Sequence, residues 1–306
     1  MSIGKSGSSD VTSVKIISRS DRALNMAFVI FILICLFLCL APVIYMVAVS
    51  FSSTRAINSH DVFLWPVEIT LTNYKRVFKD ASIFKSIFNS VFVTVFHTSF
   101  AMILSILCAY PLTKSRLHGR RPLSLLIIFT MLFSGGLIPD YLLVKSLGLT
   151  NTLWGLIVPP AINTFNMIIL RTFFANSIPK GIEEAAMVDG ANDLLILTRV
   201  VLPLSMPVLA TVALFYAVSR WNGFQDAKFY ITDSNLFTLP QRINAIVSST
   251  ALMSSVTSLQ TNAADIASTE GVESATIVVA TVPILLVYPW LQRYFVHGVT
   301  IGAIKE

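Results

Sequence analysis

Six long apolar segments alternate with polar segments along the chain. They cover residues 24–51, 87–111, 122–143, 152–175, 199–221 and 274–296. About 20 consecutive apolar residues are enough for a helix to cross the hydrocarbon core of a bilayer. Since only helices and closed barrels satisfy their backbone in lipid, the pattern predicts an all-α polytopic membrane protein with six transmembrane helices.

The polar ends of the chain lie outside this membrane domain. We expect a cytoplasmic N-terminal tail over residues 1–23, a six-helix transmembrane domain over residues 24–297, and a cytoplasmic C-terminal tail over residues 298–306. The first apolar segment is much longer than the core of a signal peptide, so we expect it to be retained as a span.

Composition and charge agree with a membrane protein. The 306 residues are 55% hydrophobic and 12% charged, whereas soluble domains are about one-quarter charged. The net charge of +6 could indicate nucleic acid. However, the basic residues lie between the apolar segments, and four of them share one short loop: Lys114, Arg116, Arg120 and Arg121. The positive-inside rule therefore predicts that both termini lie in the cytoplasm, and no nucleic-acid partner is expected.

Two larger segments then fall on the outer side of the membrane. Residues 52–86 contain Trp65-Pro66 and Asn73-Tyr74, which favour a compact hairpin at the interface. Residues 223–273 are rich in small polar residues with an apolar stretch at 243–252, which suggests a helical, partly membrane-dipping cap.

The chemistry of the spans excludes several functions. Ion-coupled carriers place a carboxylate near the membrane centre, but the acid nearest to that position is Asp140, at the outer end of a span. No hydrolase or metal motif occurs, and Cys35, Cys39 and Cys108 all lie in apolar segments without metal-ligand spacing. We therefore expect a non-catalytic subunit without a cofactor, and any uphill transport must draw its energy from another chain.

Neutral polar and aromatic residues within the spans suggest a path for a solute. Hydroxyl-rich solutes such as sugars need hydrogen-bond partners for their OH groups and flat rings for their CH faces. The candidate path residues are Asn89, Asn163, Asn166, Tyr216, Trp221 and Asn222. The alternative is that each residue bonds only to a neighbouring helix.

One charged segment, residues 179–207, interrupts the apolar pattern between the fourth and fifth spans. Pro179 suits the first turn of a helix, and Gly190 allows a turn before a second helix begins. The segment predicts a helix, a turn and a second helix at the cytoplasmic surface. The simple alternative is a solvated loop, since most charged runs are of that kind.

The order of residues in this segment resembles the EAA signature of ABC-importer membrane subunits. Glu184-Ala185-Ala186 is followed by three residues and Gly190, then by nine residues, Val200, one residue and Leu202-Pro203. Val200 stands where isoleucine is usual. Further matches favour the carbohydrate branch, the second six-span subunit of maltose-like importers; they are Asn73-Tyr74, Asn89-Ser90, Ala109-Tyr110-Pro111-Leu112, Trp221-Asn222 and residues 298–305.

The resemblance implies the type I permease fold of ABC importers, with a cytoplasmic pair of coupling helices. It implies an inner-membrane permease that imports an oligosaccharide. The partners would be a homologous permease, two cytoplasmic ATPases that hold ATP and Mg²⁺, and an extracytoplasmic sugar-binding protein. The residues that would couple the ATPases to the spans are Glu183, Glu184, Ala185, Ala186, Asp189, Gly190, Ala191, Leu202 and Pro203.

Within this set, Glu184 would be the charge that docks on the ATPase and Gly190 would provide the turn. Leu202-Pro203 would stiffen the entry into the fifth span. Two alternatives remain open, an ABC permease for a solute other than sugar and a membrane scaffold subunit that transports nothing.

Overall fold

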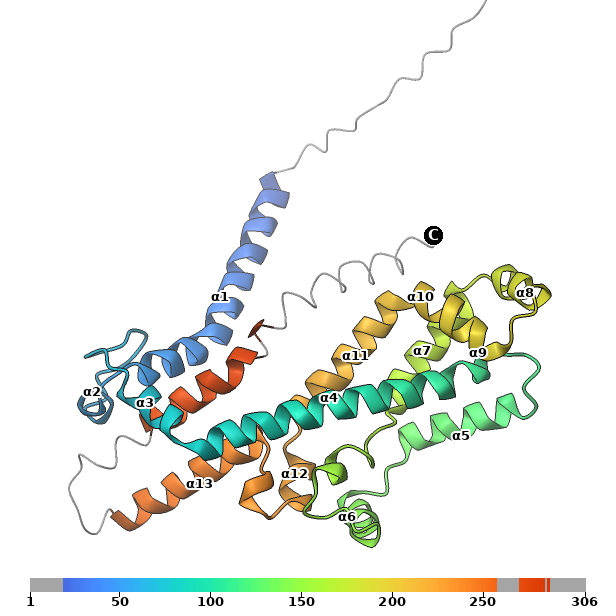
Figure 1. Ribbon diagram of the computed structural model, residues 1–306. Helices are drawn as coiled ribbons and strands as arrows, with labels where there is room; N and C mark the ends of the chain where they lie inside the picture. Colours follow the sequence, from blue (N-terminus) through green and yellow to red (C-terminus); the bar gives the residue numbers. More distant parts are fainter. Residues whose placement is uncertain (1–18, 258–269, 284, 287–306) are drawn as a thin grey trace, which may run out of the picture.

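The computed structural model describes residues 19–257, 270–283 and 285–286, and within these ranges the chain forms helices and no strand (Figure 1). The α-helices are α1 (Arg19–Ser50), α2 (Thr54–Asn58), α3 (Thr72–Lys79), α4 (Ala81–Ala109), α5 (Arg120–Leu132), α6 (Leu137–Ser146), α7 (Thr164–Ser177), α8 (Lys180–Val188), α9 (Asp193–Ile196), α10 (Leu202–Leu204), α11 (Met206–Trp221), α12 (Gln225–Tyr230) and α13 (Leu239–Thr257). Short turns of other helix types are η1 (Pro111–Thr113), η2 (Leu153–Leu156), η3 (Leu197–Val201) and η4 (Ser234–Leu236). A further helix covers residues 270–283. The predicted all-α class is confirmed.

The predicted spans differ in how continuous they are. Among the described residues, 2 helices are long and apolar enough to cross a membrane, namely residues 24–50 of α1 and the helix that begins with α4. Pro42 lies inside α1 without ending it. Two bent pairs of helices could each form another span, α5 with α6 and α9–α10 with α11. The predicted tails and the second half of the sixth predicted span fall largely outside the described residues.

The third predicted span is a broken helix. Its two parts, α5 and α6, meet at an angle of 112°. The break falls at Ser134-Gly135-Gly136, where Gly136 adopts a φ of 86° that L-residues rarely take. The side chain of Ser134 accepts a hydrogen bond from the Gly136 amide at 3.2 Å, which stabilises the local turn instead of the helix.

The fifth predicted span begins with a corner. The helical segment 193–204 meets α11 at 85°, and the buried Ser205 lies at the junction. Pro207 follows at the start of α11, where its missing N–H removes a bond that a continuous helix would need. The chain therefore changes direction between the charged segment and the apolar helix α11.

The fourth predicted span contains a short α-helix. Residues 152–163 form turns around η2 and Pro159-Pro160, and only α7 continues as α-helix. Its 14 residues extend about 21 Å. Proline disfavours the helical conformation in the residue before it, which explains why the helix begins after this pair. The Asn163 side chain caps α7 by accepting from the Asn166 amide at 3.1 Å.

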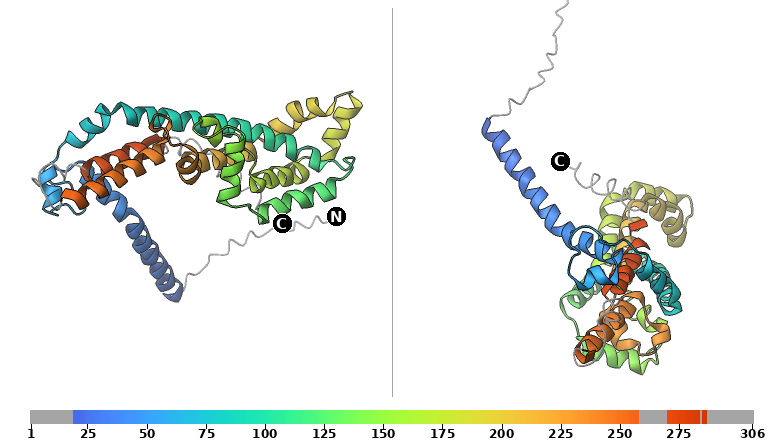
Figure 2. Two further views of the ribbon diagram at one scale, coloured as in Figure 1. Left: turned by 90° about the horizontal axis from the view of Figure 1, so that it is seen from below. Right: turned by 90° about the vertical axis from the view of Figure 1, so that its left-hand side faces the viewer.

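The centre of the molecule is a bundle of α4, α7 and α11, which share one apolar core (Figure 1). Helices α8 to α10 lie beyond one end of α4, and α2 and α3 lie at its other end (Figures 1 and 2). Helix α1 extends away from the bundle, and its buried residues are confined to its last turn, Ala48 to Ser50. The segment that resembles the coupling motif is thus joined directly to the central bundle.

The first outer segment is not the predicted hairpin. It forms two short helices, α2 and α3, which are folded against the end of α1. The buried Asn73 side chain donates to the carbonyls of Ser50 and Ser52 at 3.1 and 3.2 Å. These bonds satisfy carbonyls at and just after the end of α1 and join α3 to it, across more than 20 residues of the chain.

The second outer segment is helical, as predicted, in its described part. Helices α12 and α13 lie there, and α13 packs along the first half of α4 (Figure 2). Residues 258–269 of this segment lie outside the described residues.

Candidate functional site

The coupling segment, residues 179–207, opens with a helix that ends at a glycine. Helix α8 follows Pro179 and stops at Val188. Gly190 has a φ of 81°, and its amide donates to the Met187 carbonyl at 3.1 Å. The next amide, of Ala191, reaches back to the carbonyl of Ala186 at 3.0 Å. These two bonds form a Schellman motif, which requires a left-handed residue at the position of Gly190.

One face of α8 is packed against the rest of the molecule, and the other is exposed. Ala186 and Ala191 pack against the apolar core of the central bundle. Glu184, Ala185 and Asp189 are exposed. The small alanines let the backbone of α8 approach the core, while the Glu184 carboxylate remains available to a partner.

Glu183 does not share the exposure of its neighbour Glu184. Its carboxylate forms an ion pair with Lys114, which lies just after η1 at the end of α4. The two side chains are only 17% and 13% exposed, and the Lys114 ammonium also lies 4.2 Å from the centre of the Tyr110 ring. Arg116 forms a second ion pair, with Asp193 at the start of α9, and both of its members are 55% exposed. The coupling segment is therefore tied to the end of α4.

The second half of the segment leads into the corner before α11. Leu202 packs against the central core, whereas Pro203 is exposed. The predicted stiff entry into the fifth span is thus followed at once by the 85° bend.

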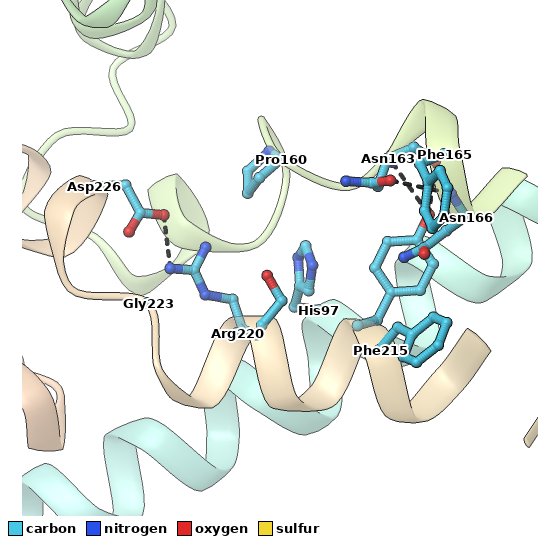
Figure 3. A pocket seen from close by; sticks show the side chains of 11 residues that line it. His97, Pro160, Asn163, Phe165, Asn166, Phe215, Arg220, Gly223 and Asp226 are labelled. Atoms are coloured by element: carbon cyan, nitrogen blue, oxygen red, sulfur yellow. Dashed lines mark hydrogen bonds and ion pairs between the residues drawn. The ribbon is translucent and has the colours of Figure 1, made fainter. Parts of the chain in front are cut away.

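A cavity of about 540 Å³ lies between α4, α7 and α11 (Figure 3). It is lined by His97, Pro160, Asn163, Phe165, Asn166, Phe215, Tyr216, Ser219, Arg220, Gly223 and Asp226. Its volume is within the range of pockets that hold small organic ligands. Its lining combines polar groups with aromatic rings, which suits a solute with both hydroxyl groups and apolar faces.

Three of the six candidate path residues line this cavity, namely Asn163, Asn166 and Tyr216. The Tyr216 hydroxyl is 2.7 Å from the Ser105 hydroxyl and accepts from the Asn163 amide at 3.1 Å. These bonds hold the phenol in place at the edge of the cavity.

The other three candidates lie elsewhere. Asn89 donates to the carbonyls of Asn235 and Phe237 at 3.1 Å each, so it holds the loop around η4 against α4. Neither Trp221 nor Asn222 lines the cavity, and Asn222 is exposed.

The sequence analysis missed an ion pair in the cavity wall. Arg220, in the last turn of α11, lies 2.6 Å from an Asp226 oxygen on α12. Arg220 is only 8% exposed, and its Nη1 also donates to the Leu156 carbonyl at 3.1 Å. The available signal was an arginine inside a segment otherwise read as apolar, because such a charge rarely faces lipid.

The ion pair also acts on the Tyr230 phenol, at the end of α12. Burial raises the pKa of this phenol, the negative charges of Asp140 and Asp226 raise it further, and the positive charge of Arg220 opposes them. Among the described residues, no three His, Cys, Asp or Glu side chains gather into a possible metal site.

Comparisons with known proteins agree with this geometry. Residues 18–301 match the family described as "Binding-protein-dependent transport system inner membrane component". The chain is 43% identical to the polygalacturonan/rhamnogalacturonan transport system permease protein YtcP of Bacillus subtilis, over 93% of this chain and 99% of that protein. It is 40% identical to protein LplC of the same species, over 86% and 88% of the two chains.

Among solved structures, the chain resembles one from a bacterial ABC transporter involved in the import of the acidic polysaccharide alginate. The TM-score is 0.82 and the identity 36%, over 91% of this chain and 98% of the other. The helical architecture described above is therefore shared with a chain of a solved ABC transporter.

Proposed function

Because the chain belongs to the family of binding-protein-dependent transport system inner membrane components, we propose that it carries an oligosaccharide across the cytoplasmic membrane. It acts as one permease subunit of an ABC importer. The resemblance inferred from the EAA signature is thereby confirmed at the level of the family.

The observation that carries the proposal is the match with sugar permeases over nearly the whole chain. The similarity to a polygalacturonan/rhamnogalacturonan permease covers 93% of this chain, and the similarity to the alginate importer covers 91%. A cavity lined by amides, a phenol and aromatic rings is chemically suited to a sugar.

The coupling segment supports the proposal that separate subunits hydrolyse ATP and that this chain responds to them. Glu184 is exposed on α8, and the small, exposed Ala185 beside it leaves room for a close approach. A carboxylate in this position can pair with a basic group of an ATPase. In this arrangement the chain catalyses nothing, and two ATPase subunits hold ATP and Mg²⁺.

The remaining partners follow from the same scheme. A homologous permease completes the translocation path, and an extracytoplasmic sugar-binding protein delivers the solute. With the six spans expected from the sequence, we propose that the N-terminal tail, the coupling segment and the C-terminal tail of residues 298–306 lie in the cytoplasm.

Reconstitution in proteoliposomes tests this function. The chain, its partner permease, two ATPases and the binding protein should import an oligosaccharide only with ATP and Mg²⁺, and omission of this chain should abolish import. Import of an amino acid or an ion instead of a sugar would overturn the substrate class. Undiminished import without this chain would assign it a scaffold role.

A further inference from the structure

Building on the proposed oligosaccharide function, we propose that Arg220 binds a carboxylate group of the solute and makes this subunit selective for acidic oligosaccharides. Asp226 occupies the guanidinium until the solute arrives. The cavity thus contains an anion site whose resting ligand is part of the chain itself.

The first support is the environment of Arg220. The residue is 8% exposed and lines the cavity. A guanidinium carries five N–H donors, and here the contacts are one to Asp226 and one to the Leu156 carbonyl. Its Nε has no hydrogen-bond partner in the described part of the chain. The buried guanidinium therefore has hydrogen-bonding capacity that the chain itself leaves unused.

The second support is that the chain leaves room for this arrangement. Gly223 lies against the guanidinium, and a Cβ atom added there would be 2.1 Å from Nη2 of Arg220. Any other residue at this position would displace the guanidinium. The absence of a side chain at Gly223 thus leaves the space that the Arg220 guanidinium occupies in the cavity wall.

The third support is the difference between the two members of the ion pair. The Asp226 side chain is 28% exposed, whereas that of Arg220 is 6% exposed. Asp226 belongs to the short helix α12, a separate element from α11. The carboxylate can therefore turn toward solvent, while the guanidinium stays in the cavity wall.

The opposite side of the cavity can hold the rest of a sugar. In Figure 3, Arg220 and Asp226 lie on one side, and Asn163, Phe165 and Asn166 lie on the other. Helix α7 starts there, and the first turn of a helix carries partial positive charge. An acidic sugar thus meets a full positive charge on one side and polar amides on the other.

The chemistry of exchange explains the selectivity. When a uronate carboxylate replaces Asp226, the buried guanidinium keeps a charged partner. A neutral sugar offers no such partner, and removal of one member of a buried pair leaves a charge uncompensated. Neutral sugars can therefore enter only if the Arg220 and Asp226 pair stays intact and fills part of the cavity.

Equilibrium binding to the complete importer in nanodiscs tests the proposal, with galacturonate trisaccharide and its neutral methyl ester as probes. The unaltered complex should bind the acid about 10-fold more tightly than the ester, and Arg220→Gln should remove this difference. Asp226→Asn should tighten binding of the acid by about 10-fold and leave the ester unchanged, because the internal competitor is gone. Lys228→Gln, which removes an exposed cation from the same short helix, is the control and should change neither affinity.

The outcomes separate this proposal from the function on which it rests. Equal binding of both probes by the unaltered complex would overturn the role of Arg220, even if neutral oligosaccharides are imported. Weaker binding of the acid by Asp226→Asn would also overturn it, and this variant retains Arg220 should Arg220→Gln fail to assemble. A complex that imports no oligosaccharide of either kind would overturn both proposals.

Discussion

The ion pair between Lys114 and Glu183 tests whether a movement of the coupling segment is transmitted to α4. It connects the segment just after α4 and η1 to α8, and the two residues are 69 positions apart in the chain. We expect Glu183→Gln to leave the importer in the membrane but to lower the amount of sugar imported per ATP. The physical reason is that α8 can then tilt without moving α4.

The size of the effect follows from burial. Exposed ion pairs contribute about 0 to 1 kcal/mol, whereas breaking a fully buried pair costs about 3 to 5 kcal/mol. Lys114 and Glu183 are 13% and 17% exposed, between these limits. We therefore expect a coupling energy of about 2 kcal/mol, which corresponds to a roughly 30-fold change in an equilibrium constant.

A double-mutant cycle measures this energy. Glu183→Gln, Lys114→Met and the double variant are compared by thermal unfolding of the purified complex and by sugar imported per ATP. The exchange of both charges, Lys114→Glu with Glu183→Lys, should restore part of the loss. Arg116 and Asp193 form the matched control, because their side chains are 55% exposed and should couple by less than about 0.5 kcal/mol.

Equally small coupling energies in the two cycles would contradict this role of the Lys114 and Glu183 pair. A Glu183→Gln importer that takes up sugar at the normal ratio to ATP would also contradict it. In either case α8 would act on the spans through its packing at Ala186 and Ala191 and through Leu202 and the corner at Ser205.

Three further predictions concern single residues. Gly190→Ala should destabilise the complex by about 1 to 2 kcal/mol, because nothing lies within 4 Å of an added Cβ and only the φ of 81° is unfavourable. Gly190→Asn should lose less stability. Equal melting temperatures for the unaltered complex and both variants would contradict this. Glu184→Lys should insert normally but abolish ATP-driven uptake, since its exposed carboxylate is the proposed docking charge, and normal uptake would remove that role. Asn222→Ala should leave uptake and sugar preference unchanged, because Asn222 is exposed and does not line the cavity; altered preference in transport assays would return it to the solute path.

Local sequence was sufficient for the features that depend on neighbouring residues. The apolar segments predicted a helical membrane protein, since a span needs only consecutive apolar residues. The helix, turn and second helix of the coupling segment were also predicted, because the Schellman motif at Gly190 joins residues five apart or fewer. The identity, order and spacing of residues along the chain carried the resemblance to the family.

Features that join distant residues required the tertiary structure. Glu183 and Glu184 are adjacent and chemically alike, yet Glu183 is paired with Lys114 and Glu184 is exposed. No periodicity reveals such a choice, because it depends on where the end of α4 lies beside α8. The same is true of the candidate path residues, of which Asn166 lines the cavity while Asn89 holds a loop.

By itself, the sequence determined the membrane class, the helical fold and the position of the coupling segment, because each is encoded in short-range order. Only the tertiary structure decided which charged side chains form ion pairs within the molecule. It brought Arg220 to Asp226 in a cavity and bent two of the predicted spans. Burial and ion pairing depend on the approach of separate helices, and that approach is a property of the packed bundle.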